Sequence, residues 1–181
     1  MIPPLADQTL TAGPYSLIPL ARGDAPDLLV LFRDPTVVEF MDIEPLANLK
    51  GAKDIILWAQ EMAERNRGLR WAIRRSGSPT LIGTVGFNTL ELDRGFRGEI
   101  AYDLAQAYWG QGVMSEILPY VMAFGFETLG LHRLEAMVTV GNLRSCRLLE
   151  RHGFTLEGQL KDHAFWKGRF WDQLVYGRLA D

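Results

Sequence analysis

A long apolar segment at 113–129 lies between two strand-like runs, and this arrangement limits the folds open to the chain. The two runs, 96–104 and 131–140, are rich in residues that favour strands. Strands joined across a helix of this length cannot form a hairpin, so we expect them to be parallel and connected by a crossover. The sequence therefore predicts a sheet that contains at least one parallel pair.

The other segments favour antiparallel strands and short helices. Strands are predicted at 15–20, 69–75, 80–92, 154–165 and 170–179, where short polar turns such as 76–79 and 93–95 join neighbouring runs. Helices are predicted at 24–32, from Asp34-Pro35 onward, at 53–65 and at 142–152. Residues 1–12 are expected to form a loose arm. The expected fold is one α+β domain over 1–181, built on a mixed, mostly antiparallel seven-stranded sheet flanked by helices.

Composition excludes several classes of function. The net charge of −3 argues against a large basic surface for nucleic acid. Cys146 is the only cysteine, so neither an intrachain disulfide nor a thiolate zinc site is expected, and no metal is predicted. The first residues lack the pattern of a signal peptide, and no apolar run has the length of a membrane span. We expect a cytoplasmic protein that contacts no membrane and is a monomer or homodimer.

Two glycines stand at the start of the long helix, in the sequence Tyr-Trp-Gly-Gln-Gly-Val-Met-Ser-Glu at 108–116. The first turn of a helix has unpaired backbone N–H groups and a positive dipole end, which together bind phosphate groups. Gly110 and Gly112 give such groups close access. A Rossmann fingerprint would need a glycine at Ser115, and a P-loop would need a Gly-Lys-Ser/Thr sequence that the chain lacks. The alternative is that the glycines serve only the turn.

A second motif follows the strand-like run at 131–140. It reads Gly-Asn-Leu-Arg-Ser-Cys-Arg-Leu-Leu-Glu-Arg-His-Gly-Phe, at 141–154. Together the two motifs resemble the GCN5-related N-acetyltransferase (GNAT) superfamily, in its acyl-CoA pyrophosphate loop and in its Asn-x-x-Ser/Ala helix that ends in Gly-Phe. The closest likeness is to the ribosomal-protein N-terminal acetyltransferase (RimJ/RimL-like) branch, where Trp replaces the usual Arg or Gln of the loop, as Trp109 does here. The resemblance covers about 15–179.

The resemblance implies an acyl-CoA N-acyltransferase fold, in which strands 96–104 and 131–140 splay apart around the pantetheine arm. It also implies acetyl-CoA as co-substrate and a primary amine as acceptor, either a protein N-terminus or a small molecule. Trp109 is expected to pack in the core. Met114 stands where the family prefers Gly or Ala, so its longer side chain has either to point away from the pyrophosphate or to crowd it and weaken CoA binding. The implied CoA-binding residues are Leu104, Gly110, Gln111, Gly112, Val113, Met114, Ser115, Asn142 and Ser145.

Direct attack of an amine on the thioester needs a base to remove the amine proton. Glu99, on the strand that leads into the glycine turn, is the first candidate, because a carboxylate there can accept the proton through water. Asp103 on the same strand is the weaker candidate. Either residue can instead be a solvated strand carboxylate. A backbone N–H near Leu104 is the expected donor to the thioester oxygen.

The departing thiolate needs a proton donor. Many relatives use a tyrosine seven residues after the helix asparagine, and this chain has Leu149 there. Ser145 matches a serine of the RimJ/RimL-like branch that is thought to hydrogen-bond the CoA sulfur, although it can equally be an ordinary first-turn serine. Asn142 can cap the helix and contact pantetheine at once. Cys146 is expected to be a buried small hydrophobe, since no histidine is placed to activate it.

Two alternatives to an acetyltransferase stay open. A non-catalytic acyl-CoA-binding module would sense CoA or regulate a partner, and Met114 together with the missing tyrosine favours it. A catalyst for another acyl group, such as succinyl, would need an arginine in the wedge between the splayed strands. The leading hypothesis is an acetyl-CoA-dependent N-acetyltransferase that binds both substrates together.

Overall fold

The computed structural model describes residues 4–180. Single turns of 3-10 helix lie at Leu5–Asp7, Arg22–Asp24 and Gln106–Tyr108, and a short π-helix at Phe124–Thr128 extends α3. The helices are α1 (Ala25–Arg33), α2 (Leu49–Glu64), α3 (Val113–Ala123) and α4 (Leu143–Arg151). The strands are β1 (Leu10–Ala12), β2 (Tyr15–Pro19), β3 (Leu69–Arg75), β4 (Gly83–Glu91), β5 (Arg97–Leu104), β6 (Arg133–Thr139), β7 (Thr155–Trp166) and β8 (Arg169–Leu179).

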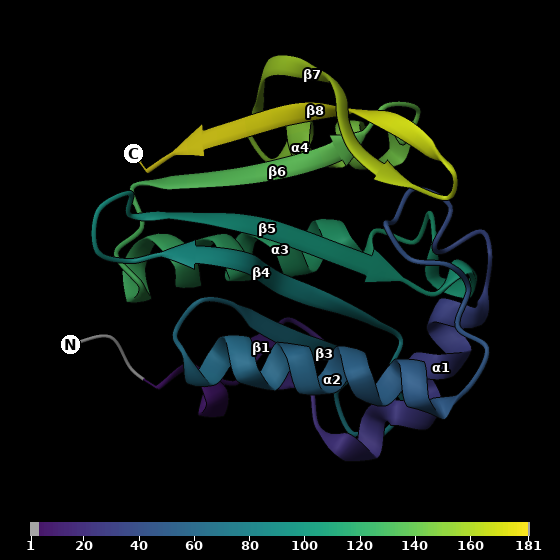
Figure 1. Cartoon of the computed structure of the whole chain (residues 1–181). Coiled ribbons are helices and arrows are strands. Elements are labelled where there is room, and N and C mark those ends of the chain that lie inside the picture. The colour runs from purple at the N-terminus through teal and green to yellow at the C-terminus, as the bar shows by residue number, and fades with distance from the viewer. Residues whose placement is uncertain (1–3, 181) are drawn as a thin grey trace.

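One sheet contains all eight strands, in the order β1-β2-β3-β4-β5-β6-β8-β7 (Figure 1). Its neighbours are antiparallel except β5 and β6, which are parallel. The helix α3 forms the connection between these two strands. The predicted α+β fold and its parallel crossover are therefore confirmed.

The prediction of a loose N-terminal arm is wrong over residues 4–12. Leu10–Ala12 pairs with β2 through a tight turn at Gly13, whose φ of +56° suits glycine. Leu5 is only 1% exposed and packs in the main core. This pairing gives the sheet eight strands where seven were predicted. The first three residues of the predicted arm lie outside the described residues.

A helix starting at Asp34-Pro35 was also predicted, and the structure has a turn there instead. The Asp34 carboxylate accepts the backbone N–H of Thr36 at 2.9 Å and its hydroxyl at 2.7 Å. Such Asx turns compete with helix formation. The next helix begins only at Leu49, where the Asn48 side chain accepts the N–H groups of Lys50 and Gly51. Residues 34–48 therefore form a long loop between α1 and α2.

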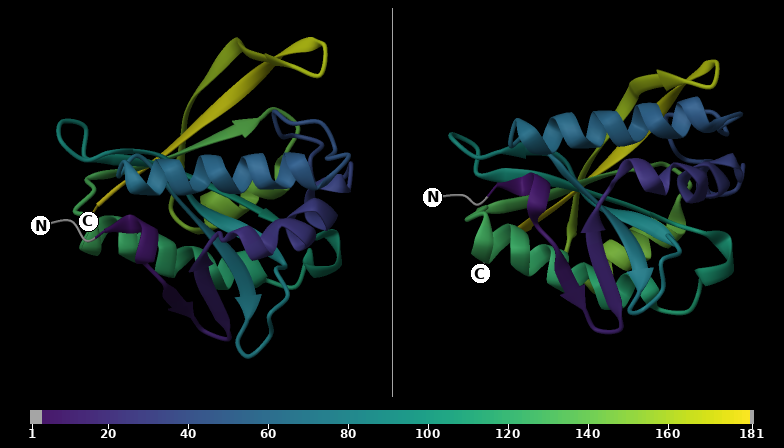
Figure 2. Two further views of the ribbon diagram at one scale, coloured as in Figure 1. Left: turned by 60° about the horizontal axis from the view of Figure 1, so that its bottom comes forward. Right: turned by 90° about the horizontal axis from the view of Figure 1, so that it is seen from below.

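Helices cover both faces of the sheet, with α1 and α2 on one face and α3 and α4 on the other (Figure 2). The larger core lies between the sheet and the second helix pair, and Trp71 contacts Phe87 and Phe124 edge-on within it. A smaller core joins α1 and α2 to the first face. Within the described residues, 4–180, none of the helices is long and apolar enough to cross a membrane.

The parallel strands β5 and β6 separate soon after they meet. They pair only over Arg97–Glu99 and Arg133–Glu135, after which β6 continues to pair with β8 as far as Thr139. The predicted splay is therefore present. At the end of the β4–β5 ladder, the Ala105 N–H donates to the Ile82 carbonyl at 2.9 Å. Successive residues of a strand direct their backbone N–H and C=O groups to opposite sides, so those of Leu104 point away from β4 and into the gap between β5 and β6.

The loop at 34–48 closes one side of this gap. The Thr139 hydroxyl donates to the Phe40 carbonyl at 3.0 Å, and the Lys167 ammonium donates to the carbonyls of Val38 and Glu39. Lys167 lies in the turn between β7 and β8, so the hairpin leans toward the α1–α2 face (Figure 2). These contacts place the loop and the hairpin around one end of the splay.

Candidate active site

A cleft of about 730 Å³ follows the splay between β5 and β6. Its walls come from the glycine turn, α4, the 34–48 loop and the β7–β8 hairpin. The structure brings together all the residues predicted to form the site except Gln111, whose side chain turns back to donate to the Ala107 carbonyl at 2.7 Å. The predicted residues that line the cleft are Glu99, Leu104, Gly110, Gly112, Val113, Met114, Ser115, Asn142 and Ser145.

The glycine turn has the geometry expected of a phosphate site. Gly110 and Gly112 have φ values of +72° and +76°, in the left-handed region that favours glycine. A Cβ atom added at either position would meet no other atom within 4 Å, so both residues face open space. Gly112 is the N-cap of α3, whose first N–H groups therefore stand beside this space. The turn fits a pyrophosphate.

Met114 does not obstruct the turn. Its side chain is 8% exposed and belongs to the main core cluster, together with Val113 and Ile117. The long side chain is accommodated by the core, and the backbone of the turn stays accessible. Cys146 is also 8% exposed and packs in the same cluster, as expected of a small hydrophobe.

Trp109 lines the cleft, so the expectation that its side chain packs in the core is wrong. Its indole N–H donates to the Leu104 carbonyl at 2.7 Å, and the Arg144 guanidinium lies 3.8 Å from its ring centre. The first contact holds the turn to the end of β5, and the second joins it to α4. Because the N–H and C=O of one strand residue point the same way, the Leu104 N–H faces the same edge of β5.

Three arginines on one face of α4 add positive charge to this side of the cleft. Arg144, Arg147 and Arg151 follow at helical spacing and all line the cleft. Within residues 4–180 none of the three forms an ion pair. Unpaired guanidinium groups beside a helix N-terminus suit phosphate groups. Sequence reasoning did not identify this row, although its spacing was visible.

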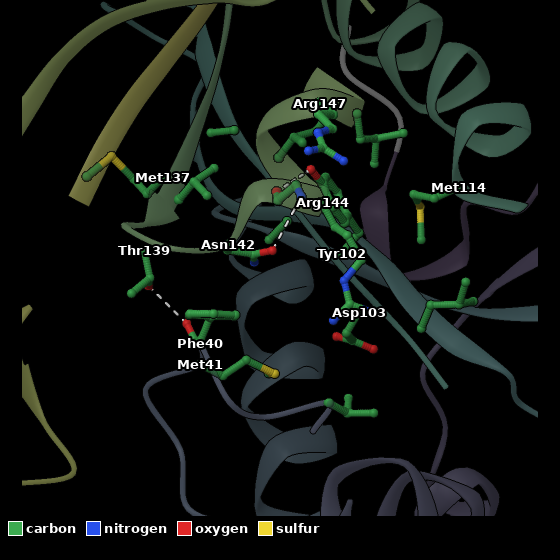
Figure 3. A pocket seen from close by; sticks show the side chains of 18 of the residues that line it. Phe40, Met41, Tyr102, Asp103, Met114, Met137, Thr139, Asn142, Arg144 and Arg147 are labelled. Atoms are coloured by element: carbon green, nitrogen blue, oxygen red, sulfur yellow. Dashed lines mark hydrogen bonds between the residues drawn. The ribbon is translucent and has the colours of Figure 1, made fainter. Parts of the chain in front are cut away.

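The second motif places a serine against a partly buried tyrosine. Asn142 caps α4, with its side-chain oxygen accepting the Ser145 N–H at 3.3 Å. The Ser145 and Tyr102 hydroxyls lie 2.7 Å apart and share a hydrogen bond. Figure 3 labels Tyr102, Asn142 and Arg144 among the side chains that line this part of the cleft. Burial raises the pKa of the Tyr102 phenol well above its usual value, so it stays protonated. Leu149, where relatives carry tyrosine, is fully buried.

Glu99 lies on the opposite face of β5 from Tyr102. Burial raises the pKa of its carboxyl, and Glu135, its register partner on β6, raises it further. The neighbouring Asn88 and Thr89 side chains and the charge of Arg70 oppose the rise. The result is a cleft carboxylate that is more basic than an exposed one.

Asp103 is committed to a buried ion pair. One oxygen accepts the Thr84 N–H at 3.0 Å, and the other accepts the Thr84 hydroxyl at 2.8 Å and Arg70 at 3.1 Å. Burial raises the pKa of the Asp103 carboxyl, while Arg70 and Thr84 oppose the rise. With both oxygens occupied, Asp103 is poorly placed to accept a proton. No cluster of metal-binding side chains occurs in the described part of the chain.

Comparison with known proteins gives consistent results. Residues 16–155 match the family model described as an acetyltransferase (GNAT) domain. The N-acetyltransferase p20 of Bacillus licheniformis is 33% identical over 172 residues, which cover 95% of this chain and 96% of its own length. The ribosomal-protein-serine acetyltransferase of Escherichia coli is 33% identical over 102 residues, 56% of each chain.

Solved structures show the same fold. RimJ of Mycobacterium smegmatis, in complex with CoA-disulfide, has a TM-score of 0.87 and 22% identity over 99% of this chain and 90% of its own. A RimL structure in complex with coenzyme A has a TM-score of 0.86 and 22% identity, covering 96% of this chain and 99% of its own. The matched domain, the long relative and the site geometry agree: the chain belongs to the GNAT family of N-acetyltransferases.

Proposed function

We propose that the protein transfers an acetyl group from acetyl-CoA to the α-amino group of a protein by direct attack, with both substrates bound at once. The main support is a cleft that passes through the sheet. The phosphate-binding features and the Tyr102–Ser145 pair lie on the α3–α4 face, and Glu99 lies on the α1–α2 face. This separation lets the two substrates approach from opposite faces and meet between β5 and β6.

Acetyl-CoA, when bound, supplies an acetyl group activated as a thioester. The turn at Gly110 and Gly112 and the first N–H groups of α3 would hold its pyrophosphate, with the α4 arginines near its remaining phosphate. Asn142 and Ser145 would contact the pantetheine arm. The separated edges of β5 and β6 leave backbone groups free to bind an extended amide chain.

Glu99 would remove the proton from the acceptor ammonium, directly or through one water. Its raised pKa makes it a better base than an exposed carboxylate. The pKa of an α-amino group is near 8, well below that of lysine, so an α-amine needs less assistance. Asp42, which also lines the cleft, adds negative charge that attracts a cationic acceptor.

Two further groups complete the proton and charge balance. The Leu104 N–H would donate to the carbonyl oxygen as negative charge develops there. The Tyr102 hydroxyl would protonate the sulfur as the carbon–sulfur bond breaks, with Ser145 orienting it. Glu99 thus gains the proton that the amine loses, and Tyr102 supplies the proton that the thiolate gains. Holding both substrates together would supply much of the rate.

A polypeptide acceptor is favoured by the surface beside the cleft. Phe165 and Phe170 stack edge-to-face on the β7–β8 hairpin, and each is about three-fifths exposed, at 62% and 60%. Ala164 and Trp166 alternate with Phe165 along β7 and line the cleft, so the phenylalanine pair lies on the outer face of the hairpin, where a polypeptide acceptor that passes over the hairpin can cover it. The name of the Escherichia coli relative, a ribosomal-protein-serine acetyltransferase, agrees with this class of acceptor.

Acetyl is favoured over succinyl as the transferred group. Arg70, the cleft arginine beside Glu99, already pairs with Asp103 and donates to Asn88, so its guanidinium is not free to form an ion pair with the carboxylate of a succinyl group. An acetyl group is small and uncharged, so it needs no arginine to pair with it.

The first test combines CoA binding with thiol release. Acetyl-CoA and CoA are titrated calorimetrically, and thiol release is then measured with peptides bearing free N-termini, with N-terminally blocked lysine peptides and with polyamines. Release with free N-termini alone supports the proposal. Thiol release with polyamines alone would show that the acceptor is a small amine and not a protein N-terminus. Tight CoA binding without thiol release would support the non-catalytic module.

Glu99→Gln tests the base. We expect turnover at neutral pH to fall by roughly 10²-fold or more, with CoA affinity unchanged. Glu91→Gln, an exposed carboxyl paired with Arg97 outside the cleft, is the matched control and should keep wild-type turnover. Unchanged turnover of Glu99→Gln across pH 6 to 9 would remove Glu99 from the mechanism.

A further inference from the structure

Arg70 is an almost buried cation whose side chain reaches the acceptor side of the cleft. It belongs to β3, and its side chain is 12% exposed. One end of the guanidinium contacts Asp103 at 3.1 Å, and the other donates to the Asn88 side-chain oxygen at 3.2 Å. Arg70, Asn88 and Glu99 all line the same cleft. A planar guanidinium held at both ends has one orientation available to it.

The first contact fixes Arg70 in place. The Asp103 side chain is 4% exposed, and its oxygens also accept the backbone N–H and hydroxyl of Thr84 on β4. The ion pair is therefore tied to two neighbouring strands of the sheet. The other end of the guanidinium is therefore also held in place, where it contacts Asn88.

The second contact fixes Asn88. The β4–β5 register shifts between Phe87 and Thr89, so Asn88 is the extra residue of a β-bulge opposite Ile100 and Glu99. Bulges often redirect a side chain near a functional site. Because the amide oxygen of Asn88 accepts from Arg70, its NH₂ group is the part left to face Glu99, its neighbour across the bulge, and the Asn88 side chain lowers the pKa of the Glu99 carboxyl.

We propose that Arg70 is a positioning residue: by fixing the Asn88 carboxamide, it holds the Glu99 carboxylate in the orientation that receives the acceptor proton. This inference rests on the proposed role of Glu99 as the base. Arg70 itself contacts neither the acceptor amine nor the thioester. Its influence passes through one hydrogen bond to Asn88 and through its charge.

The charged groups around Glu99 determine the sign of the pH effect. Arg70 faces it from β3 and Glu135 from β6, where Glu135 pairs with Arg133. Asp103 lies on the same strand, and Asp42 and His163 line the cleft from the loop and the hairpin. The positive charge of Arg70 lowers the pKa of Glu99, so its removal raises that pKa. Activity that needs ionised Glu99 would then begin at a higher pH.

The experiment compares pH profiles of kcat and kcat/KM for Arg70→Met, Arg70→Lys and Asn88→Ala. We expect all three to lower kcat by about tenfold or more, since misplacing a reacting group is costly, and to leave CoA affinity unchanged. Arg70→Met should also shift the acid limb of the profile to higher pH. Arg70→Lys keeps the charge and should keep the limb near its wild-type position. Asn88→Ala keeps the Arg70–Asp103 pair and so covers the case in which Arg70→Met fails to fold.

Arg74→Met is the matched control. Arg74 lies on the same strand and pairs with the buried Asp24 outside the cleft, so its loss breaks a comparable ion pair without touching Glu99. It should reduce thermal stability and leave kcat and the acid limb unchanged. If Arg74→Met lowers kcat as much as Arg70→Met, the effect is general destabilisation and the proposal is wrong.

The outcome for Glu99→Gln separates two kinds of failure. If Glu99→Gln has a lower kcat while folded Arg70→Met and Asn88→Ala keep the wild-type kcat and pH profile, the positioning role of Arg70 is refuted and the role of Glu99 as the base is supported. If Glu99→Gln keeps the wild-type profile, the proposed base is refuted and the positioning role with it.

Discussion

Substitution of Gly112 by alanine should separate the strain of the glycine turn from its role in binding. Gly112 has a φ of +76°, which costs a residue with a Cβ atom roughly 1 to 2 kcal/mol. The lower entropy of the unfolded alanine chain offsets about 0.4 to 1 kcal/mol of this. The net loss is therefore about 1 kcal/mol, or roughly 2 to 4 °C in Tm for a chain of this size.

The effect on binding should be larger. The new methyl group meets no protein atom within 4 Å, so it occupies the space expected for the pyrophosphate. Loss of one hydrogen bond to a charged group costs about 1.5 to 3 kcal/mol. This corresponds to a roughly 10- to 150-fold increase in the Kd for CoA. Calorimetric titration measures the Kd, and thermal unfolding measures the Tm.

Gly77→Ala is the matched control for this prediction. Gly77 lies in the turn between β3 and β4, with a φ of +81° and no atom within 4 Å of an added Cβ. It should lose as much stability as Gly112→Ala and bind CoA like the wild type. Equal CoA affinity for the two variants would refute the reasoning that this turn holds the pyrophosphate.

Four further predictions test other parts of the structure. Tyr102→Phe removes the proposed proton donor and should lower kcat roughly a hundredfold while sparing CoA affinity, measured by thiol release and calorimetry. Arg147→Ala should weaken CoA binding and reduce its dependence on salt, as titrations at two ionic strengths would reveal. Leu5→Ala empties a core position and should lower the free energy of unfolding by about 2 to 5 kcal/mol, measured by denaturant unfolding. Burial raises the pKa of Glu99 in the folded protein, so ionisation of Glu99 lowers stability as pH rises through that folded-state pKa. Glu99→Gln removes this loss, so thermal unfolding should show the variant to be more stable than the wild type at pH 7 and equally stable near pH 4.

The sequence predicted the parts of the site that depend on local pattern. The glycine turn, the Asn142 cap and the crossover through α3 each leave a signal within a few residues, because backbone geometry alone demands them. The position of Glu99 beside the cleft was also predictable, since it lies on the strand that enters the turn, while its role as the base stays a prediction.

The sequence did not predict contacts made across the sheet. Tyr102 meets Ser145 from 43 residues away, and Arg70 reaches Asp103 across 33 residues. No local periodicity records such pairs. The missed strand β1 is similar, because its three residues form a strand only through pairing with β2. The sequence Asp34-Pro35 correctly indicated a capping side chain, but the Asp34 carboxylate stabilises a turn and no helix follows it.

The position of β8 has a consequence for folding. It follows β7 along the chain but lies between β6 and β7 in the sheet, so β6 cannot acquire its outer neighbour until β8 has been made. Hairpins form locally and quickly, so β7 and β8 can pair first and then add to β6 as a unit. That addition also brings Lys167 to the carbonyls of Val38 and Glu39, more than 120 residues earlier. Tyr176 and Arg178 of β8 also donate to Glu150 and His152 at the end of α4, so docking of the hairpin completes both the CoA side and the acceptor side of the cleft in one step.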